Sequence, residues 1–165
     1  MTPFERTYNG LKHMNRRPRA LIVEDESSAQ ELLRATMSRG GIDTLIAKNG
    51  AEGLYHFLSE TPIDLVILDI IMPEVGGEDF LKTVEYLHKG HIKTTKSKII
   101  VYSAMNNSEE LQHYSGYECV HSILQKPAGI RAILTAAQSI LSASGFSVSA
   151  EESVEKAVSR STLTQ

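Results

Sequence analysis

Short apolar runs recur along the chain, separated by longer stretches in which apolar residues return every three or four positions. The clearest run, Leu65–Leu68, is unbroken and is β-branched at Val66 and Ile67. Such runs are typical of strands in parallel sheets, which are buried on both faces. Pro73 and the glycines behind it end this strand and turn the chain. The pattern predicts five strands, within residues 20–23, 44–47, 65–68, 98–104 and 119–125.

Each strand is followed by a stretch with helical periodicity. Ser28 to Glu31 has the form of a capping box, and Gly40-Gly41 closes the helix that it opens. The apolar faces predicted for the five helices are Ala29, Leu32, Leu33, Thr36 and Met37; Ala51, Leu54, Tyr55 and Leu58; Phe80, Leu81, Val84 and Leu87; Leu111 and Tyr114; and Ile130, Ile133, Leu134, Ala137, Ile140 and Leu141. The helix that opens near residue 107 is the weakest, because it has the fewest apolar anchors.

Five strands alternating with five helices predict an α/β fold, a doubly wound (βα)5 arrangement around a five-stranded parallel sheet. We expect a flexible basic leader over residues 1–18, one domain over 19–144 and a polar tail over 145–165. Residues 89–97 are polar and basic, and we expect them to form a loop.

Composition narrows the class of protein. The chain has 165 residues, 41% hydrophobic and 22% charged, which is ordinary for a globular protein. A net charge of -3 gives no reason to expect direct nucleic-acid or membrane binding. The sequence has no run long enough for a transmembrane helix and no signal peptide. With a single cysteine, Cys119, that we interpret as a small apolar filler, the chain is expected to be cytoplasmic.

Polar side chains stand where the predicted strands end. The first strand ends in Glu24-Asp25, the third in Asp69, the fourth in Ser103 and the fifth in Lys126. The carboxyl ends of parallel strands meet at one edge of the sheet, where ligands of open α/β sheets bind. Three carboxylates there form a hard oxygen site suited to Mg²⁺. A carboxylate beside a metal and an ammonium group suits acceptance of a phosphoryl group, which Ser103 could then hydrogen-bond.

In these features the sequence resembles the receiver domains of two-component response regulators, which have a flavodoxin-like fold. The resemblance covers roughly residues 19–141. It rests on Glu24-Asp25, Asp69-Ile70-Ile71-Met72-Pro73 with Gly76-Gly77 behind, Ser103-Ala104 and Lys126-Pro127. Each motif alone is weak, but four in order, each at a strand end, are specific.

The resemblance implies a role for each matching residue. Asp69 is the phosphoacceptor, which takes its phosphoryl group from a histidine kinase or phosphotransfer protein. Glu24, Asp25, Asp69 and the backbone carbonyl of Ile71 bind Mg²⁺. Ser103 is the hydroxyl switch. Lys126 contacts the phosphoryl group and is followed by a cis peptide bond into Pro127. The small Ala104 leaves the phosphoryl group accessible.

Phosphorylation is then expected to switch a surface that a downstream protein recognises. That surface is formed by the helix from 107, the strand within 119–125 and the helix over 130–141 (the fourth helix, fifth strand and fifth helix of the pattern). If it also pairs two chains, a homodimer accompanies the switch.

The sequence departs from the family at the aromatic switch position, three residues before the lysine, where Ile123 stands. Tyr102 is no substitute, because strand alternation points it away from the face that Ser103 uses. In receiver domains the positions that hold or hinder a hydrolytic water lie two residues after the phosphoacceptor and two after the switch hydroxyl; the resemblance places them at Ile71 and Met105 here. Both are apolar, which predicts slow loss of the phosphoryl group unless Asn106 or Glu109 supplies a polar contact.

Four alternative interpretations arise, and the residues argue against the last three. The chain could be the amino-terminal receiver of a longer regulator whose output domain is missing, because the polar tail cannot bury a second core. An Asp-based phosphohydrolase of the haloacid dehalogenase type would need a second Asp where Ile71 stands. A degenerate receiver that only binds partners would not need the intact acid pair, Asp69 and Lys126. A flavodoxin would need a hydroxyl-rich phosphate loop in place of Glu24-Asp25-Glu26.

Overall fold

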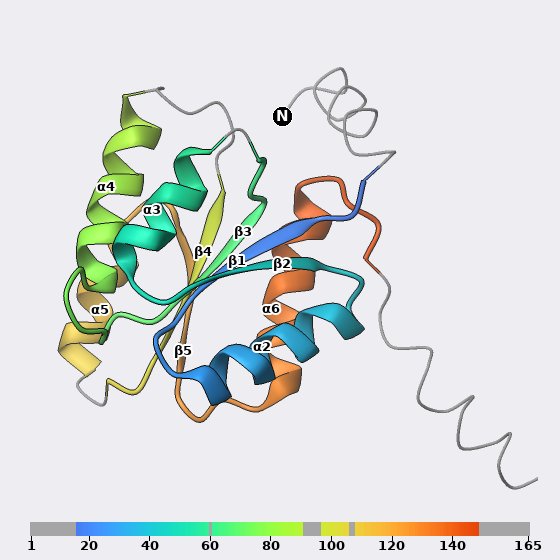
Figure 1. Ribbon diagram of the computed structural model, residues 1–165, viewed down its shortest axis with the longest axis horizontal. Helices are drawn as coiled ribbons and strands as arrows, with labels where there is room; N and C mark the ends of the chain where they lie inside the picture. The colour runs from blue at the N-terminus through green and yellow to red at the C-terminus, as the bar shows by residue number, and fades with distance from the viewer. Residues whose placement is uncertain (1–15, 60, 91–96, 106–107, 149–165) are drawn as a thin grey trace, which may run out of the picture.

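The computed structural model describes residues 16–59, 61–90, 97–105 and 108–148, and confirms the predicted α/β architecture. A parallel sheet of five strands has the order β2-β1-β3-β4-β5 (Figure 1). The strands are β1 (Arg19–Val23), β2 (Asp43–Ala47), β3 (Leu65–Leu68), β4 (Lys98–Ser103) and β5 (Val120–Gln125). The helices are α2 (Ser27–Arg39), α3 (Gly50–Leu58), α4 (Gly77–Lys89), α5 (Ser108–Ser115) and α6 (Ile130–Ala143).

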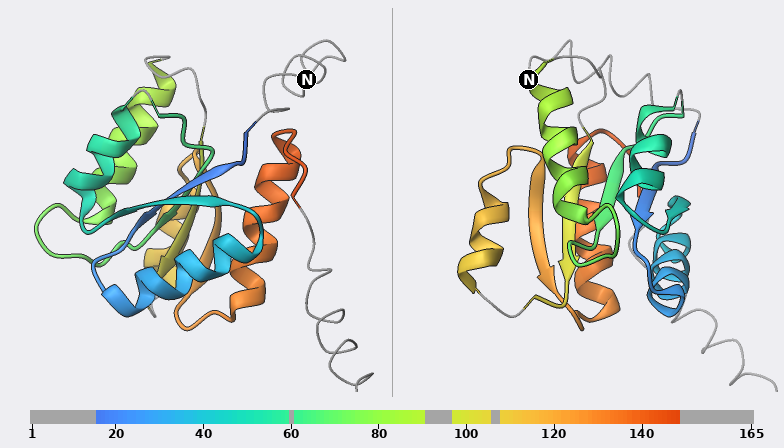
Figure 2. Two further views of the ribbon diagram at one scale, coloured as in Figure 1. Left: turned by 45° about the vertical axis from the view of Figure 1, so that its right-hand side comes forward. Right: turned by 60° about the vertical axis from the view of Figure 1, so that its left-hand side comes forward.

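The helices cover both faces of the sheet, α3, α4 and α5 on one side and α2 and α6 on the other (Figures 1 and 2). Strand residues therefore alternate between two cores. Leu21 and Val66 pack toward Phe80 of α4, whereas Ile22 and Ile67 pack toward α2 and α6. Because β3 is completely buried between these layers, its unbroken apolar run has the pattern expected of a central parallel strand.

The strand order also places a ligand crevice. From β1 the chain first builds β2 on one side, and then crosses to β3 on the other side before continuing outward to β4 and β5. Loops after β1 and β3 therefore diverge at the carboxyl edge of the sheet, as at the switch points where α/β proteins bind ligands.

The predicted helix positions hold, but three details of their faces and ends are wrong. The side chain of Ser28 does not cap α2: Glu26 is the N-cap residue, without a side-chain capping bond, and Ser28 donates its hydroxyl to the Glu26 carboxylate. In α3, Tyr55 and Leu58 are 74% and 57% exposed, and Phe57 faces the core instead. Leu32 and Ile130, at the edges of α2 and α6, are also exposed.

Close packing explains the rotated face of α3. A Cβ on Gly53 would lie 3.1 Å from both Phe80 and Val23, so α3 approaches β1 and α4 closely at this glycine, and Phe57 packs into the core one turn later. Counting apolar residues cannot detect a face of this kind.

The packed region continues past residues 19 and 144. Arg16 forms an ion pair with Asp64, and Phe146 is buried against the core between the sheet, α2 and α6. Most of the predicted leader and tail, much of the 89–97 loop, and Asn106 lie outside the described residues, so the division at these positions stays a prediction. Within the described part, no helix is long and apolar enough to cross a membrane.

Candidate phosphoacceptor site

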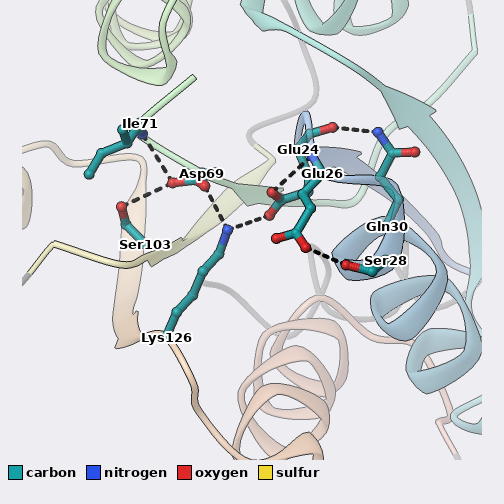
Figure 3. A network of polar contacts seen from close by, with 8 residues as sticks. All are labelled: Glu24, Glu26, Ser28, Gln30, Asp69, Ile71, Ser103 and Lys126. Atoms are coloured by element: carbon teal, nitrogen blue, oxygen red, sulfur yellow. Dashed lines mark hydrogen bonds and ion pairs between the residues drawn. The ribbon is translucent and has the colours of Figure 1, made fainter. Parts of the chain in front are cut away.

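The strand-end side chains meet at the carboxyl edge of the sheet, as predicted (Figure 3). Lys126 Nζ lies 2.6 Å from Glu24 Oε2 and 2.6 Å from Asp69 Oδ2. Both carboxylates are almost completely buried, and the lysine side chain is only 18% exposed. One ammonium group therefore bridges two buried carboxylates that would otherwise repel each other.

The second oxygen of Asp69 accepts two further hydrogen bonds. Ser103 Oγ and the backbone N–H of Ile71 each donate to Asp69 Oδ1, both at 3.0 Å (Figure 3). Asp69 is thus held by an ammonium group on one oxygen, and by a hydroxyl and an amide on the other.

The local backbone positions Asp69 at the end of β3. Its N–H donates to the Val23 carbonyl at 2.9 Å, which continues the pairing with β1. The next loop folds back so tightly that a Cβ on Gly77 would lie 2.0 Å from the Asp69 carbonyl oxygen. Only glycine fits there, so Gly77 is required for the loop that carries Ile71.

Lys126 is positioned by β4 and by the loop after β5. Its N–H donates to the Ser103 carbonyl at 2.8 Å, and the peptide bond into the exposed Pro127 is cis, as the resemblance implied. Its Nζ lies 5.3 Å from the centroid of the Tyr102 ring, a favourable cation–π distance. Tyr102 itself faces the core of α2 and α6, as strand alternation predicted.

Burial and charge act together on these groups. Burial raises the pKa of the Glu24 carboxyl above its ordinary value, the Lys126 ammonium opposes this, and the Asp69 charge adds to it. Burial would lower the pKa of Lys126, but its hydrogen bonds with Asp69 and Glu24 outweigh that effect and raise it. The ammonium is therefore a permanent positive charge at this edge.

Asp25 completes a group of three carboxylates. Glu24, Asp25 and Asp69 each offer an oxygen within 4.8 Å of the others, with Asp25 exposed and the other two buried. Oxygen donors are what hard divalent cations prefer, and an exposed edge leaves room for the waters that such ions keep. The donor set therefore fits a cation of this kind.

The remaining predicted residues surround this group or pack behind it. Ile71 is 57% exposed and Ala104 is also exposed, whereas Met105 is half-buried against the core of α3, α4 and α5. Ile123 is half-buried in the same core. Asn106 and the side chain of Glu109, the polar alternatives, are outside what the structure describes.

Two neighbours were missed from the sequence. Gln30 Nε2 donates to the backbone carbonyl of Glu24 at 2.6 Å, and Gly77 makes the close approach described above (Figure 3 for Gln30). The sequence identifies Gly77 as a turn glycine and as part of the motif behind Asp69, but not its close approach to the Asp69 carbonyl. Nothing in the local pattern distinguishes Gln30 from an ordinary solvent-facing residue of a first helical turn.

Comparisons with known proteins agree with this geometry. A model of the family described as the response regulator receiver domain matches residues 20–138. The response regulator protein PilR of Pseudomonas aeruginosa is 34% identical over 92 residues, which are 56% of this chain and 20% of PilR. The transcriptional regulatory protein CusR of Escherichia coli is 39% identical over 70 residues, 42% of this chain and 30% of CusR.

Solved structures share the fold. The Francisella response regulator 1452 receiver domain aligns with a TM-score of 0.66 at 22% identity, covering 77% of this chain and 98% of that one. A sensor protein from Polaromonas aligns with a TM-score of 0.67 at 22% identity, covering 78% of this chain and 99% of that one.

Proposed function

The chain belongs to the family of response regulator receiver domains, and from this premise we propose that Asp69 is its phosphoacceptor. The observation that carries the proposal is the set of donors around Asp69: Lys126 on one oxygen, Ser103 and the Ile71 amide on the other. All three are donors that a newly attached phosphoryl group can use.

The proposed reaction is a transfer between two nucleophiles. A carboxylate oxygen of Asp69 attacks the phosphorus of a phosphohistidine in a histidine kinase or phosphotransfer protein. The phosphorus–nitrogen bond breaks, its electron pair returns to the imidazole ring, and that ring takes up a proton on leaving. Asp69 becomes an acyl phosphate. We infer that the chain acts as a signalling module rather than as a metabolic enzyme.

The chain's own residues have separate tasks in this reaction. Lys126 can follow the charge from the carboxylate to the phosphoryl oxygens, because an ammonium group donates in any direction. Ser103 can turn its hydroxyl from Asp69 Oδ1 to a phosphoryl oxygen, which supports its proposed role as the switch. Exposed Ala104 and half-buried Met105 follow it, so movement of Ser103 would act directly on the β4–α5 loop.

The carboxylate group supports a magnesium site. We propose that Glu24, Asp25, Asp69 and the backbone carbonyl of Ile71 hold Mg²⁺, with Glu24 and Asp25 supplied by the end of β1. When bound, Mg²⁺ would neutralise negative charge on the transferring oxygens. Among the described residues, Lys126 is the cation that pairs with Glu24 and Asp69.

The partners are proposals by the same reasoning. The switched surface would be α5, β5 and α6, where a downstream protein binds and where two chains could pair. Among the described side chains of α5, Tyr114 is buried and Leu111 is half-buried, so this helix is the least anchored of the layer and the best suited to move. Ile123 makes the aromatic half of the usual switch unavailable.

The chain spans 20% of PilR and 30% of CusR, so what those whole proteins do is not transferred to it. A receiver that is part of a longer regulator is compatible with these proportions. We propose residues 19–144 as the receiver, with the leader and tail at either side, and a cytoplasmic location in keeping with a kinase partner.

Mass spectrometry after incubation with acetyl phosphate and Mg²⁺ tests the phosphoacceptor. The wild-type chain should gain one phosphoryl group, and Asp69→Ala should gain none. Asp43→Ala is the matched control, because Asp43 is an exposed carboxylate at the opposite end of the sheet, and it should behave as wild type. An adduct on Asp69→Ala, or an adduct that forms equally well in EDTA, contradicts the assignment.

A further inference from the structure

Asp25 differs from the other two carboxylates of the group in how its side chain is held in position. Glu24 and Asp69 are buried and bound to Lys126, whereas Asp25 is exposed and no hydrogen bond among the described residues holds its carboxylate. Its position in the group of three therefore depends on the backbone of the β1–α2 turn, residues 24–26.

Gln30 holds that backbone on both sides of Asp25. Its own N–H donates to the carbonyl of Glu26 at 2.9 Å, which is the ordinary first hydrogen bond of α2. Its side-chain Nε2 donates to the carbonyl of Glu24 at 2.6 Å (Figure 3). A carbonyl can only accept, so the amide N–H₂ is the group that must face it. The first bond is available to any helical residue, but the second requires a side-chain donor of this length.

Both backbone polar groups of residue Glu24 are consequently held. Its N–H donates to the Ala47 carbonyl of β2 at 3.0 Å, and its carbonyl accepts from Gln30. The peptide before Glu24 is thus tied to the sheet, and the carbonyl of the peptide that leads into Asp25 is held by α2. Removing the Gln30 amide would free the carbonyl and allow this peptide to rotate.

We propose that Gln30 is a positioning residue for Mg²⁺: its side-chain amide fixes the Glu24–Asp25 peptide so that the Asp25 carboxylate points toward Glu24 and Asp69. The inference rests on the proposed function, since it takes Asp25 to be a Mg²⁺ ligand. Mg²⁺ demands nearly ideal octahedral geometry, so a small rotation of one ligand weakens binding. Outer partners that orient metal ligands are worth roughly 10- to 100-fold in affinity.

Calorimetric titration of the full chain with MgCl₂ tests the inference. Gln30→Met keeps the length and helix propensity of the side chain but removes the donor, and should weaken Mg²⁺ binding roughly tenfold. The rate of phosphorylation by acetyl phosphate at saturating Mg²⁺ should stay within about twofold of wild type, because the reacting groups are intact. Gln112→Met, the same change on the exposed face of α5, should leave affinity unchanged.

Gln30→Glu separates positioning from charge. An added carboxylate near a cation site would tighten Mg²⁺ binding if charge alone mattered. If the hydrogen bond positions the turn, the lost donor and the repulsion of the Glu24 carbonyl should weaken binding instead. Amide hydrogen exchange of residues 24–26 should also accelerate in both variants. Because Gln30→Glu is isosteric with the native side chain, it also serves if Gln30→Met does not fold.

The outcomes separate this inference from the proposed function. Asp25→Asn should weaken Mg²⁺ binding strongly; if it does not, the metal site itself is misassigned and both proposals fail. If Asp25→Asn weakens binding but a folded Gln30→Met binds within twofold of wild type, or Gln30→Glu binds more tightly, the positioning role of Gln30 alone is overturned.

Discussion

Two aspartates flank β3, and their surroundings differ in an instructive way. Asp64 precedes the strand and Asp69 follows it; they are 7% and 5% exposed, and each is paired with a cation. The two carboxylates therefore have similar burial, at opposite ends of the same strand, but Asp64 has Arg16 to itself whereas Asp69 shares Lys126 with Glu24.

Asp64 is a closed site. The Arg16 guanidinium binds both of its oxygens at 2.7 Å, and the N–H of Arg19 donates to one of them at 2.8 Å. Arg16 also lies 5.1 Å from the centroid of the Phe146 ring, so it joins residues from both ends of the packed region. Because the planar Arg16 guanidinium occupies both carboxylate oxygens of Asp64, little room remains for another ligand to bind them.

Asp69 is an open site. Its ammonium partner is shared with Glu24, and its other contacts come from a rotatable hydroxyl and one amide. Lys126 and Ser103 can each turn to a new acceptor without leaving the site. The two carboxylates thus differ in the type and sharing of the cation that holds them rather than in their burial, and it is the shared, rotatable set of donors that supports the proposal for Asp69.

The largest effect should come from opening the closed site. Arg16→Met leaves the buried Asp64 carboxylate without its guanidinium, which should cost about 3 kcal/mol of unfolding free energy. Arg17→Met is the matched control, because Arg17 is 73% exposed and 4.0 Å from Asp43; it should cost less than about 0.5 kcal/mol. Urea unfolding measures both, and equal losses would contradict a special role for Arg16.

The next effect concerns how long the open site would hold the phosphoryl group that the proposed function places on Asp69. Ile71 and Met105 are apolar, so neither orients a water for hydrolysis. An Ile71→Asn, Met105→Glu double variant should release phosphate roughly tenfold faster or more, since a positioned polar group assists attack by water. Phosphate release from the purified adduct measures this. Release at the wild-type rate, with unchanged folding, would mean that other side chains control it.

A smaller effect is expected from relieving the repulsion at the open site. In Mg²⁺-free buffer at neutral pH, Glu24→Gln removes one of three crowded carboxylates and keeps an acceptor for Lys126. Unfolding free energy should rise by about 1 kcal/mol, as expected where function maintains a destabilising charge. Glu31→Gln, an exposed change on α2, should stay within about 0.5 kcal/mol. A clear loss of stability in Glu24→Gln would show that the bridge through Lys126 outweighs the repulsion.

The last effect becomes visible only on acidification and concerns a second paired carboxylate, Glu85 of α4. Burial acts to raise its pKa, but hydrogen bonds from the Cys119 thiol, Lys89, and the N–H groups of Cys119 and Glu118 lower it to about 2. The unfolded chain takes up this proton near pH 4.5 and the folded chain only near 2. Stability contributed by Glu85 is therefore present above pH 4.5 and is lost as the pH falls toward 2.

Glu85→Gln should therefore reduce the slope of unfolding free energy against pH in the acid range. The reduction should correspond to about one proton fewer taken up on unfolding. Urea unfolding between pH 5 and about pH 2 measures the slope. Glu118→Gln, an exposed change next to the same loop, should keep the wild-type slope. An unaltered slope in Glu85→Gln would mean that the carboxylate is not held ionised by the α5–β5 loop.

Much of the fold and of the candidate site followed from local pattern. Short apolar runs, unbroken in β3 but interrupted by polar residues in β5, identified the five strands. Each polar residue at a strand end lies close to its counterparts because the topology of a parallel sheet brings all carboxyl ends to one edge. Glu24, Asp69, Ser103 and Lys126 could be grouped in this way without any knowledge of side-chain direction.

Contacts between elements were decided only by the tertiary structure. The face of α3 depends on how closely Gly53 approaches Phe80, and the Arg16–Asp64 pair joins residues 48 positions apart. Gln30 has the signature of a solvent-facing helix residue until the turn after β1 places the Glu24 carbonyl against it. Periodicity along a sequence determines which elements form, because that signal is local. Which side chains of those elements meet depends on distances set by all the layers together, and no single segment of the chain encodes them.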